Sequence, residues 1–473
     1  RRRSGSHYTP RALTEPIVRT TLEPVLARLR SESAVTPSAP PAVPLSPSAA
    51  RRVNSAQGPE SGLLAALGMT GQAPLPVTPS DPSSVTLRET KGPGPTSLRP
   101  RSEQILDLKI CDPAMGSGAF LVEACRQLGD ALIEAWAVHG GKPPIPPDED
   151  EVVFARRLVA QRCLYGVDKN PTAVDLAKVS LWLAREHPFT FLDHALRHGD
   201  SLVGLTQRQI EVFHWQGDAP RFQTGFETLE TRAQVARAAE LRAQIRHAGE
   251  EMSEAELNAL WQEAQAELAR ARLYGDLVVA AFFEEGKPKE RERQRMAYAA
   301  EVLDGSAHQH LARLEEWRHA DPPLVPFHWE IEFPEVFQRA NPGLDAVMGN
   351  PPFAGKNTLT EGNPPGYLDW LQHLHEESHG NADLVAHFFR RAFNLIRDGG
   401  TPGLIATNTI AQGDTRATGL RWICTHGGEI YAARKRVPWP GRAAVIVSVV
   451  HVAKGPDTFR DAPPVTLSAP RSR

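Results

Sequence analysis

The chain has 473 residues, which is enough for one large domain with insertions or for two or three domains. A hydrophobic content of 41% and a charged content of 23% are typical of a soluble globular protein, and no apolar run reaches the ~18 residues of a membrane-spanning helix. The net charge of −3 gives no global nucleic-acid signature, so such binding would need a local basic groove. Four widely spaced cysteines and no signal-peptide core predict free thiols in a cytoplasm, and the missing initiating Met indicates a fragment.

The amino-terminal segment, residues 4–30, carries apolar residues at helical spacing after a polar start. This pattern predicts one or two short helices, with Pro16 and Pro24 expected only near helix starts. Residues 31–104 are rich in Pro and Ser, which predicts a linker or a disordered insertion.

A nucleotide-binding α/β unit is predicted where the composition changes. Residues 105–111 alternate like a strand, residues 112–120 form a glycine-bearing turn, and residues 121–136 have the pattern of a helix. Glycines let a backbone approach a ligand at the carboxyl end of such a strand. The alternative is a tight strand-to-helix turn without a ligand.

A second unit comes next, with a helix over 152–161, a strand over 163–167 and a helix over 172–185. Asp168 ends its strand, where a carboxylate suits the hydroxyls of a ribose or caps the next helix. Asp200 ends another short segment and could accept from an adenine amino group or cap the next segment of the chain.

The stretch from 226 to 318 has the composition of a helical insertion. Its charges are typical of a solvated face, and contact with DNA is the alternative. His375-Glu-Glu-Ser-His379 matches the helical zinc-protease pattern H-E-x-x-H. Because Gly380-Asn381 should break the helix there and no third ligand is found nearby, we expect a polar helix end and no metal site.

A short apolar strand, residues 344–348, leads into Gly349-Asn-Pro-Pro-Phe353. Two prolines stop the strand and leave the Asn350 amide, the Asn350 and Pro351 carbonyls and the Phe353 ring in a stiff turn. Those groups suit a flat substrate with an NH2 group, because oxygens accept its N–H bonds while the ring stacks on its face. An ordinary strand-ending turn is the alternative.

The remainder predicts a helix over 383–396 that Gly399-Gly400 would end, and a strand over 403–409. Two β-rich runs, residues 429–437 and 443–453, predict a hairpin that closes a sheet.

Taken together, the motifs resemble those of N6-adenine DNA methyltransferases that use S-adenosylmethionine. The four motifs are Asp112-Pro-Ala-Met-Gly-Ser-Gly-Ala-Phe120, Gly166-Val-Asp-Lys-Asn-Pro171, Gly199-Asp-Ser-Leu202 and Asn350-Pro-Pro-Phe353. Ser6-His-Tyr-Thr-Pro10, the helical insertion and Trp439-Pro-Gly-Arg-Ala443 resemble parts of the large methylases of type IIG restriction-modification and BREX- or DISARM-type phage defence.

This resemblance implies an α/β Rossmann-like fold with a seven-stranded, mostly parallel sheet, an antiparallel last strand and a helical insertion. The implied organisation is an amino-terminal helical segment (1–30), a linker (31–104), the cofactor half of the core (105–225), the insertion (226–318), the catalytic half (319–455) and a tail (456–473).

The resemblance also implies site residues. The cofactor pocket would contain Tyr8, Thr9, Asp112, Pro113, Ala114, Gly116, Gly118, Phe120, Asp168 and Asp200, and the catalytic turn Asn350, Pro351, Pro352 and Phe353. Asp112 would lie near the methionine end of the cofactor, Asp168 would bind its ribose and Asp200 its adenine. Asn350 and the Pro351 carbonyl would hold the target amino group while Phe353 stacks on the flipped base.

The implied function is transfer of a methyl group to N6 of a flipped adenine, with S-adenosylmethionine as cofactor and no metal. The implied partners are double-stranded DNA and other subunits of a bacterial restriction or phage-defence system, without a membrane. Two alternatives stay open: methylation of RNA or of a protein glutamine, and an inactive methylase-like DNA-recognition subunit of a defence complex. The chain shows no convincing target-recognition domain and no nuclease motif.

Overall fold

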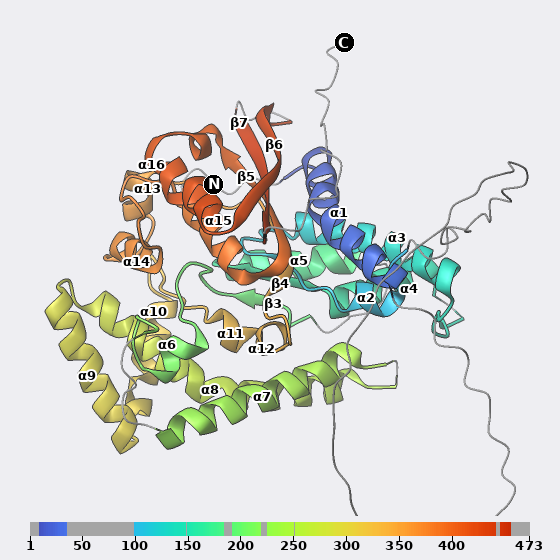
Figure 1. Cartoon of the computed structure of the whole chain (residues 1–473). Coiled ribbons are helices and arrows are strands. Elements are labelled where there is room, and N and C mark those ends of the chain that lie inside the picture. The colour runs from blue at the N-terminus through green and yellow to red at the C-terminus, as the bar shows by residue number, and fades with distance from the viewer. Residues whose placement is uncertain are drawn as a thin grey trace, which may run out of the picture.

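The computed structural model describes residues 9–35, 99–147, 149–183, 192–218, 225–249, 251–440 and 445–455. A seven-stranded sheet runs through its centre (Figure 1). The strands are β1 (Ile110–Asp112), β2 (Leu164–Asp168), β3 (Leu196–His198), β4 (Leu344–Gly349), β5 (Ile396–Thr407), β6 (Gly428–Pro438) and β7 (Ile446–Lys454).

The strand order is β3-β2-β1-β4-β5-β7-β6. Neighbours from β3 to β5 pair in parallel, whereas β7 is antiparallel to both β5 and β6. The sheet is thus mostly parallel with an antiparallel last strand, which confirms the predicted α/β methyltransferase fold. In such open sheets ligands bind outside the carboxyl ends of the strands, where the strand order reverses. Here that point lies between β1 and β4.

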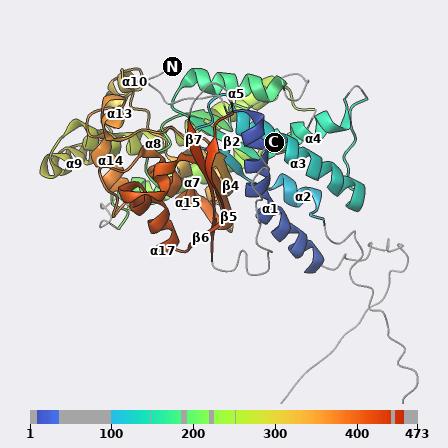
Figure 2. The same ribbon diagram turned by 90° about the horizontal axis from the view of Figure 1, so that it is seen from above.

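Side-chain alternation along the strands divides the core into two layers. Ile110, Ala346 and Ile405 pack on one face, and their neighbours Cys111 and Val347 pack on the other. The first face is covered by α1 (Arg11–Val35), α2 (Ser102–Leu106), α3 (Ala119–His139), α4 (Glu151–Arg162) and α5 (Pro171–Leu183). The second is covered by α11 (Trp329–Glu332), α12 (Pro334–Phe337), α15 (Leu384–Leu395), η3 (Asn408–Ala411), η4 (Ala417–Arg421) and α17 (Trp422–Thr425). The short helix α16 (Gly413–Arg416) lies between η3 and η4 in the chain. Figure 2 shows the strands between these two sets of helices.

A third apolar cluster unites the remaining helices. These are α6 (Gln207–Glu211), α7 (Gly225–His247), α8 (Glu254–Glu284), α9 (Pro288–Asp304), η2 (Ala307–His310), α10 (Leu311–Arg318), α13 (Lys356–Glu361) and α14 (Tyr367–Leu374). Buried ion pairs join this part to the second face of the sheet. Arg242 of α7 contacts Glu335 at 2.7 Å, and Arg272 of α8 contacts Glu332 at 2.5 Å.

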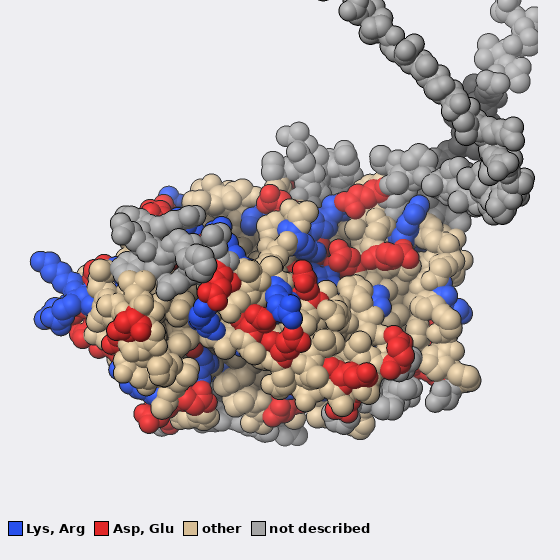
Figure 3. Space-filling view, turned by 90° about the horizontal axis from the view of Figure 1, so that it is seen from below, with Lys and Arg blue, Asp and Glu red and all other residues tan. Residues whose placement is uncertain are grey.

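The surface charges of α7 and α8 largely pair with one another. Arg237 lies 2.7 Å from Glu263, and Arg270 lies 3.0 Å from Glu230. Figure 3, which views the molecule from the side of these helices, shows acidic and basic side chains interspersed on this face. This arrangement is that of a solvated helical pair, and it offers no broad basic surface on that face.

The structure corrects the prediction for the amino-terminal segment. Residues 11–35 form a single helix with Pro16 and Pro24 in its interior, not short helices that begin at prolines. Pro24 has no N–H to donate to the Thr20 carbonyl one turn earlier, but the Tyr431 hydroxyl donates to that oxygen at 3.0 Å. Tertiary contacts therefore replace the missing helical hydrogen bond.

Two further local predictions are wrong. Ile105 belongs to helix α2, where Gln104 caps the Arg101 N–H at 2.9 Å, and the strand begins only at Ile110. Gly399 and Gly400 do not end helix α15, which stops at Leu395, but lie within an irregular part of β5. Gly399 has a φ of +76°, a conformation that favours glycine. None of the helices that the structure describes is both long and apolar enough to cross a bilayer.

Candidate active site

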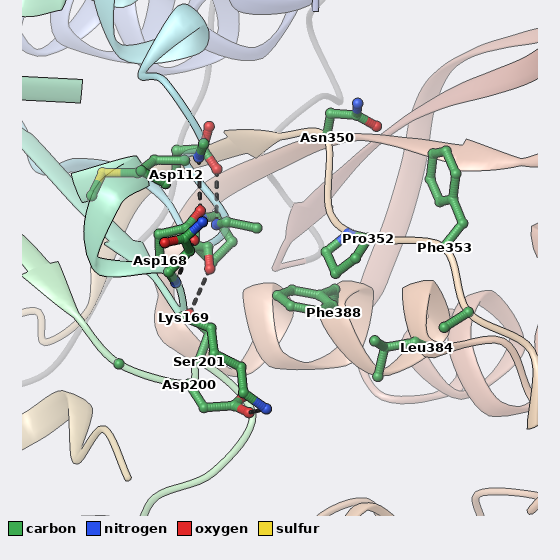
Figure 4. A pocket seen from close by; sticks show the side chains of 18 of the residues that line it. Asp112, Asp168, Lys169, Asp200, Ser201, Asn350, Pro352, Phe353, Leu384 and Phe388 are labelled. Carbon is green, nitrogen blue, oxygen red and sulfur yellow. Dashed lines mark hydrogen bonds and ion pairs between the residues drawn. The ribbon is translucent and has the colours of Figure 1, made fainter. Parts of the chain in front are cut away.

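A cavity of about 1060 Å³ lies at the carboxyl edge of the sheet, where β1 and β4 are neighbours. Both halves of the predicted site line it, although about 240 residues separate Asp112 from Asn350 in the chain. Figure 4 shows Asp112, Asp168 and Asp200 on one side of this space and the Asn350 turn on the other. The pairing of β4 with β1 therefore brings the two sets of residues together.

Asp112 ends β1 and its carboxylate is buried. One oxygen accepts from the Ala114 N–H at 3.0 Å, which fixes the start of the glycine turn. Burial raises the pKa of Asp112 to about 8, the Ala114 N–H opposes this shift and the charge of Asp168 adds to it. At neutral pH this carboxyl group is therefore mostly protonated until a cation or another donor reaches it.

Asp168 ends β2, and its two oxygens accept from the N–H groups of Gly116 and Asn170, each at 2.8 Å. Burial raises the pKa of Asp168, and these two N–H groups oppose the shift. The cap of α5 is instead Asn170, whose side chain accepts from the Thr172 N–H at 3.0 Å. Asp168 thus ties the glycine turn to β2 and still lines the cavity.

Asp200 lies just after β3 and is also buried. Its carboxylate accepts from the Leu202 N–H at 3.0 Å, so it caps the next turn of the chain, as one of its two predicted roles requires. It also lies 3.0 Å from Lys169 Nζ and accepts from the Tyr367 hydroxyl. The three carboxylates stand at the ends of three adjacent strands and face one cavity.

The turn that is predicted to be catalytic leaves β4 at Gly349. The Asn350 amide nitrogen donates to the Thr9 hydroxyl at 3.3 Å, so a residue close to the start of α1 reaches the site. The Asn350 Oδ1 atom is buried and has no hydrogen-bond partner among the described residues. An unpaired buried oxygen is costly unless a ligand donates to it, so it marks the position for a donor.

An apolar wall continues from the turn. Pro352 and Phe353 line the cavity, and Leu384 and Phe388, one turn apart on α15, line it as well (Figure 4). Asp383 caps α15 by accepting from the Val385 N–H at 3.0 Å. Sequence reasoning located this helix but missed its two cavity residues, because the periodicity of a helix buried nearly all round does not show which face meets a ligand.

The other predicted residues divide into two groups. Thr9, Pro113, Ala114, Gly116 and Phe120 line the cavity. Gly118 and Pro351 are not among the lining residues. A Cβ on Gly118 would lie 3.2 Å from the backbone of Ala177, so this glycine lets α3 begin against α5. Tyr8 lies outside the described residues.

The zinc-protease pattern does not form a helical site. Helix α14 ends at Leu374, and His375 is buried with its Nδ1 atom 2.9 Å from Nδ1 of His387. His379 is exposed and pairs with Asp414 at 3.1 Å. The helix therefore ends before the first histidine, not at the second as predicted. Among the described residues no group of three or more His, Cys, Asp or Glu side chains is placed to hold a metal ion.

Residues 162–425, more than half of the chain, match the model of the Eco57I restriction-modification methylase family. The chain belongs to this family. Residues 88–208 also match the model of the DNA-methyltransferase domain of MmeI.

The relatives of this family member are distant. A protein of Methanocaldococcus jannaschii, named as a putative type II restriction enzyme and methyltransferase, is 23% identical in an alignment of 354 positions that covers 68% of the chain and 28% of that relative. The chain thus spans little more than a quarter of its length.

Two solved structures also show similarity. The type IIL enzyme MmeI in complex with DNA is 14% identical with a TM-score of 0.35, over 75% of the chain and 32% of MmeI. The M protein of the type I restriction enzyme EcoKI is 12% identical with a TM-score of 0.33, over 75% of the chain and 42% of that protein. The assignment of the fold is based on the strand order of this chain and not on these structures.

Proposed function

We propose that this protein binds S-adenosylmethionine beside Asp112, Asp168 and Asp200 and methylates N6 of an adenine in DNA held by the Asn350 turn. One observation carries the proposal: a single cavity is lined both by the row of strand-end carboxylates and by Asn350, whose buried Oδ1 has no hydrogen-bond partner among the described residues. A transfer between two ligands requires both to reach one space, and this cavity offers it.

The carboxylates fit the chemistry of that cofactor. The carboxylate oxygens at the ends of β1, β2 and β3 can accept hydrogen bonds from a positively charged amino group, from a pair of ribose hydroxyls and from a purine amino group. Membership in a restriction-modification methylase family supports the same assignment. We further propose that the activity serves a restriction-modification or phage-defence system.

The chain would act by orienting the target amino group. Its lone pair is delocalised into the purine ring, so it attacks poorly unless it is drawn out of the plane. Asn350 Oδ1 would accept one N–H. The carbonyl of Pro351, which lies between the cavity residues Asn350 and Pro352 but does not itself line the cavity, would accept the other, and both bonds favour a tetrahedral nitrogen. Alignment alone contributes about 7 kcal/mol or more in well-oriented reactions.

The transfer balances without a further reactant. When bound, S-adenosylmethionine supplies a methyl group on a positively charged sulfur, which keeps the electrons of the broken C–S bond. The N6 lone pair forms the new C–N bond, and N6 then loses one proton, which passes to solvent as the methylated base leaves the cavity. Pro352, Phe353, Leu384 and Phe388 exclude water from this space, which favours a step that disperses charge. An adenine inside a duplex must flip out to reach the turn.

Two exposed cationic side chains on the edge strand β6 support the proposal that the substrate is a nucleic acid. The sheet register places Ala433 of β6 at the level of Gly349, three strand spacings or about 14 Å away. Lys435 and Arg436 come after Ala433, are exposed, and form no ion pair with the described residues. Cations at that separation from a flipped base suit the phosphates that flank it.

The test is methyl transfer from labelled S-adenosylmethionine to duplex DNA, RNA and protein, with the modified nucleoside identified by mass spectrometry. We expect N6-methyladenine in DNA, abolished by Asn350→Ala and retained by Asn341→Ala, which removes an exposed amide outside the cavity. Label in RNA or protein alone would refute the DNA assignment. Cofactor binding without any transfer would favour an inactive recognition subunit.

A further inference from the structure

The segment between the catalytic turn and helix α14, residues 354–367, forms part of the cavity wall. Its cavity-lining residues are Ala354, Thr358, Gly362, Asn363 and Tyr367. Its start is held on the target side, because the Ala354 N–H donates to Asp383 at 3.3 Å and the Ala354 carbonyl accepts from the Leu384 N–H at 2.9 Å. The segment therefore continues directly from the residues proposed to hold the target base.

The far part of the same segment is held by the cofactor side. Lys169 Nζ donates to Asn363 Oδ1 at 2.9 Å and lies 3.0 Å from Asp200 Oδ2. The Tyr367 hydroxyl donates to both oxygens of Asp200, at 3.0 and 3.1 Å. Lys169 Nζ also lies 5.1 Å from the centroid of the Tyr367 ring, within the range of a cation–π interaction. The contacts of Lys169 with Asn363 and of Tyr367 with Asp200 join residues more than 160 positions apart.

The Asp200 carboxylate has room for one more donor. An ionised carboxylate offers about four acceptor positions. The Leu202 N–H, Lys169 and the single Tyr367 O–H, which is shared between both oxygens, supply three donor hydrogens. A ligand amino group at the fourth acceptor position would touch the same carboxylate that holds the wall segment. Asp200 and Tyr367 are both buried, and in such an environment neighbouring hydrogen bonds polarise one another.

We propose that Lys169 and Tyr367 are positioning residues. Through them, binding of a ligand amino group to the Asp200 carboxylate makes residues 354–367 more ordered. The inference rests on the proposed function, in which Asp200 receives the amino group of the cofactor purine. A donor at Asp200 completes the buried network and stabilises the wall segment, and the segment in turn fixes the start of the target pocket at Ala354. Because coupling is reciprocal, a base in the target pocket would tighten cofactor binding by the same factor.

Hydrogen–deuterium exchange of residues 354–374, with and without saturating S-adenosylmethionine, tests the coupling. We expect the cofactor to slow exchange there in the native protein by roughly 10-fold and to slow it little in Tyr367→Phe, which loses a hydrogen bond to a charged group. The matched control is Tyr298→Phe, because its hydroxyl also donates to a carboxylate, Glu284 at 2.6 Å, but lies outside the cavity. This control should keep the full cofactor effect.

The readout separates coupling from a merely structural role. If Tyr367→Phe speeds exchange equally with and without the cofactor, the residue only supports the fold and the inference is wrong. Lys169→Met, paired with Lys142→Met, whose amine lies 3.3 Å from Glu151 outside the cavity, gives a second test should Tyr367→Phe fail to fold. Calorimetric binding without protection of residues 354–374 would overturn the coupling alone, whereas no cofactor binding at all would overturn the proposed function and the coupling with it.

Discussion

Replacement of Asp112 by Asn should stabilise the cofactor-free protein at neutral pH while it weakens cofactor binding. The native carboxyl group is buried, which raises its pKa from an ordinary 3.8 to about 8. Between these values the folded protein holds a proton that the unfolded chain has lost, so stability falls as pH rises. Above about pH 8 both states are ionised and the loss is complete. An Asn side chain keeps an oxygen for the Ala114 N–H and carries no titrating proton.

The magnitude comes from linkage. Each pKa unit corresponds to about 1.4 kcal/mol, so a group shifted from 3.8 to about 8 lowers stability by about 1.6 kcal/mol at pH 5 and about 4 kcal/mol at pH 7. The free energy of unfolding of Asp112→Asn relative to the native protein should therefore rise by about 2.5 kcal/mol between these two pH values. Most single substitutions destabilise, so a gain of this size is diagnostic.

Urea unfolding at pH 5, 6 and 7 measures this difference directly. Asp345→Asn is the matched control of opposite sign. Burial alone would raise the pKa of Asp345, but Arg339 and Arg397 hold it below its ordinary range. The Asp345 carboxylate stabilises the folded state at neutral pH, and this stabilisation is lost on acidification. Asp345→Asn should therefore lower the free energy of unfolding most at neutral pH. A stability difference for Asp112→Asn that does not change with pH would refute the reasoning.

Three further outcomes are expected. Asn350→Ala should lower the methyl-transfer rate by about 100-fold or more and leave cofactor affinity within about 2-fold in calorimetry, because Asn350 is proposed to hold the target base and not the cofactor. Gly349→Ala should weaken cofactor binding at least about 10-fold, since a Cβ there would lie 2.5 Å from Asp112 Oδ1; unchanged affinity would contradict this contact. Arg242→Met should destabilise the protein by about 3–5 kcal/mol in urea unfolding by leaving Glu335 buried without its partner, and a double variant that also removes the Glu335 charge should recover part of that loss.

The outline of the fold was accessible from the sequence because its signals are local. A glycine turn between a strand and helix α3, an acidic residue at the end of β2 and the β6–β7 hairpin each depend on fewer than 30 consecutive residues. The local errors also have a common cause. A short apolar run such as 105–111 suits a helix end and a strand equally, and only packing decides between them.

The contacts that complete the site were not accessible in this way. Nothing near Lys169 indicates that its amine meets Asn363, and nothing near Tyr367 indicates Asp200. Pro24 is similar, since its place inside α1 depends on a hydroxyl from Tyr431, about 400 residues later. Such pairs arise from the order of the strands, which places distant segments side by side only after the sheet has formed.

Gly349, the residue before Asn350, illustrates what the sequence and the structure each indicate about the site. From the sequence, Gly349 is only the last residue of a strand before two prolines. In the sheet, β4 lies beside β1, and the position of a Gly349 side chain would fall on the Asp112 carboxylate. A residue without a side chain is therefore required for the two strand ends to meet, and that meeting places Asn350 in the lining of the cavity that the three carboxylates face. The proximity on which methyl transfer would depend is thus set by the absence of one methyl group at position 349.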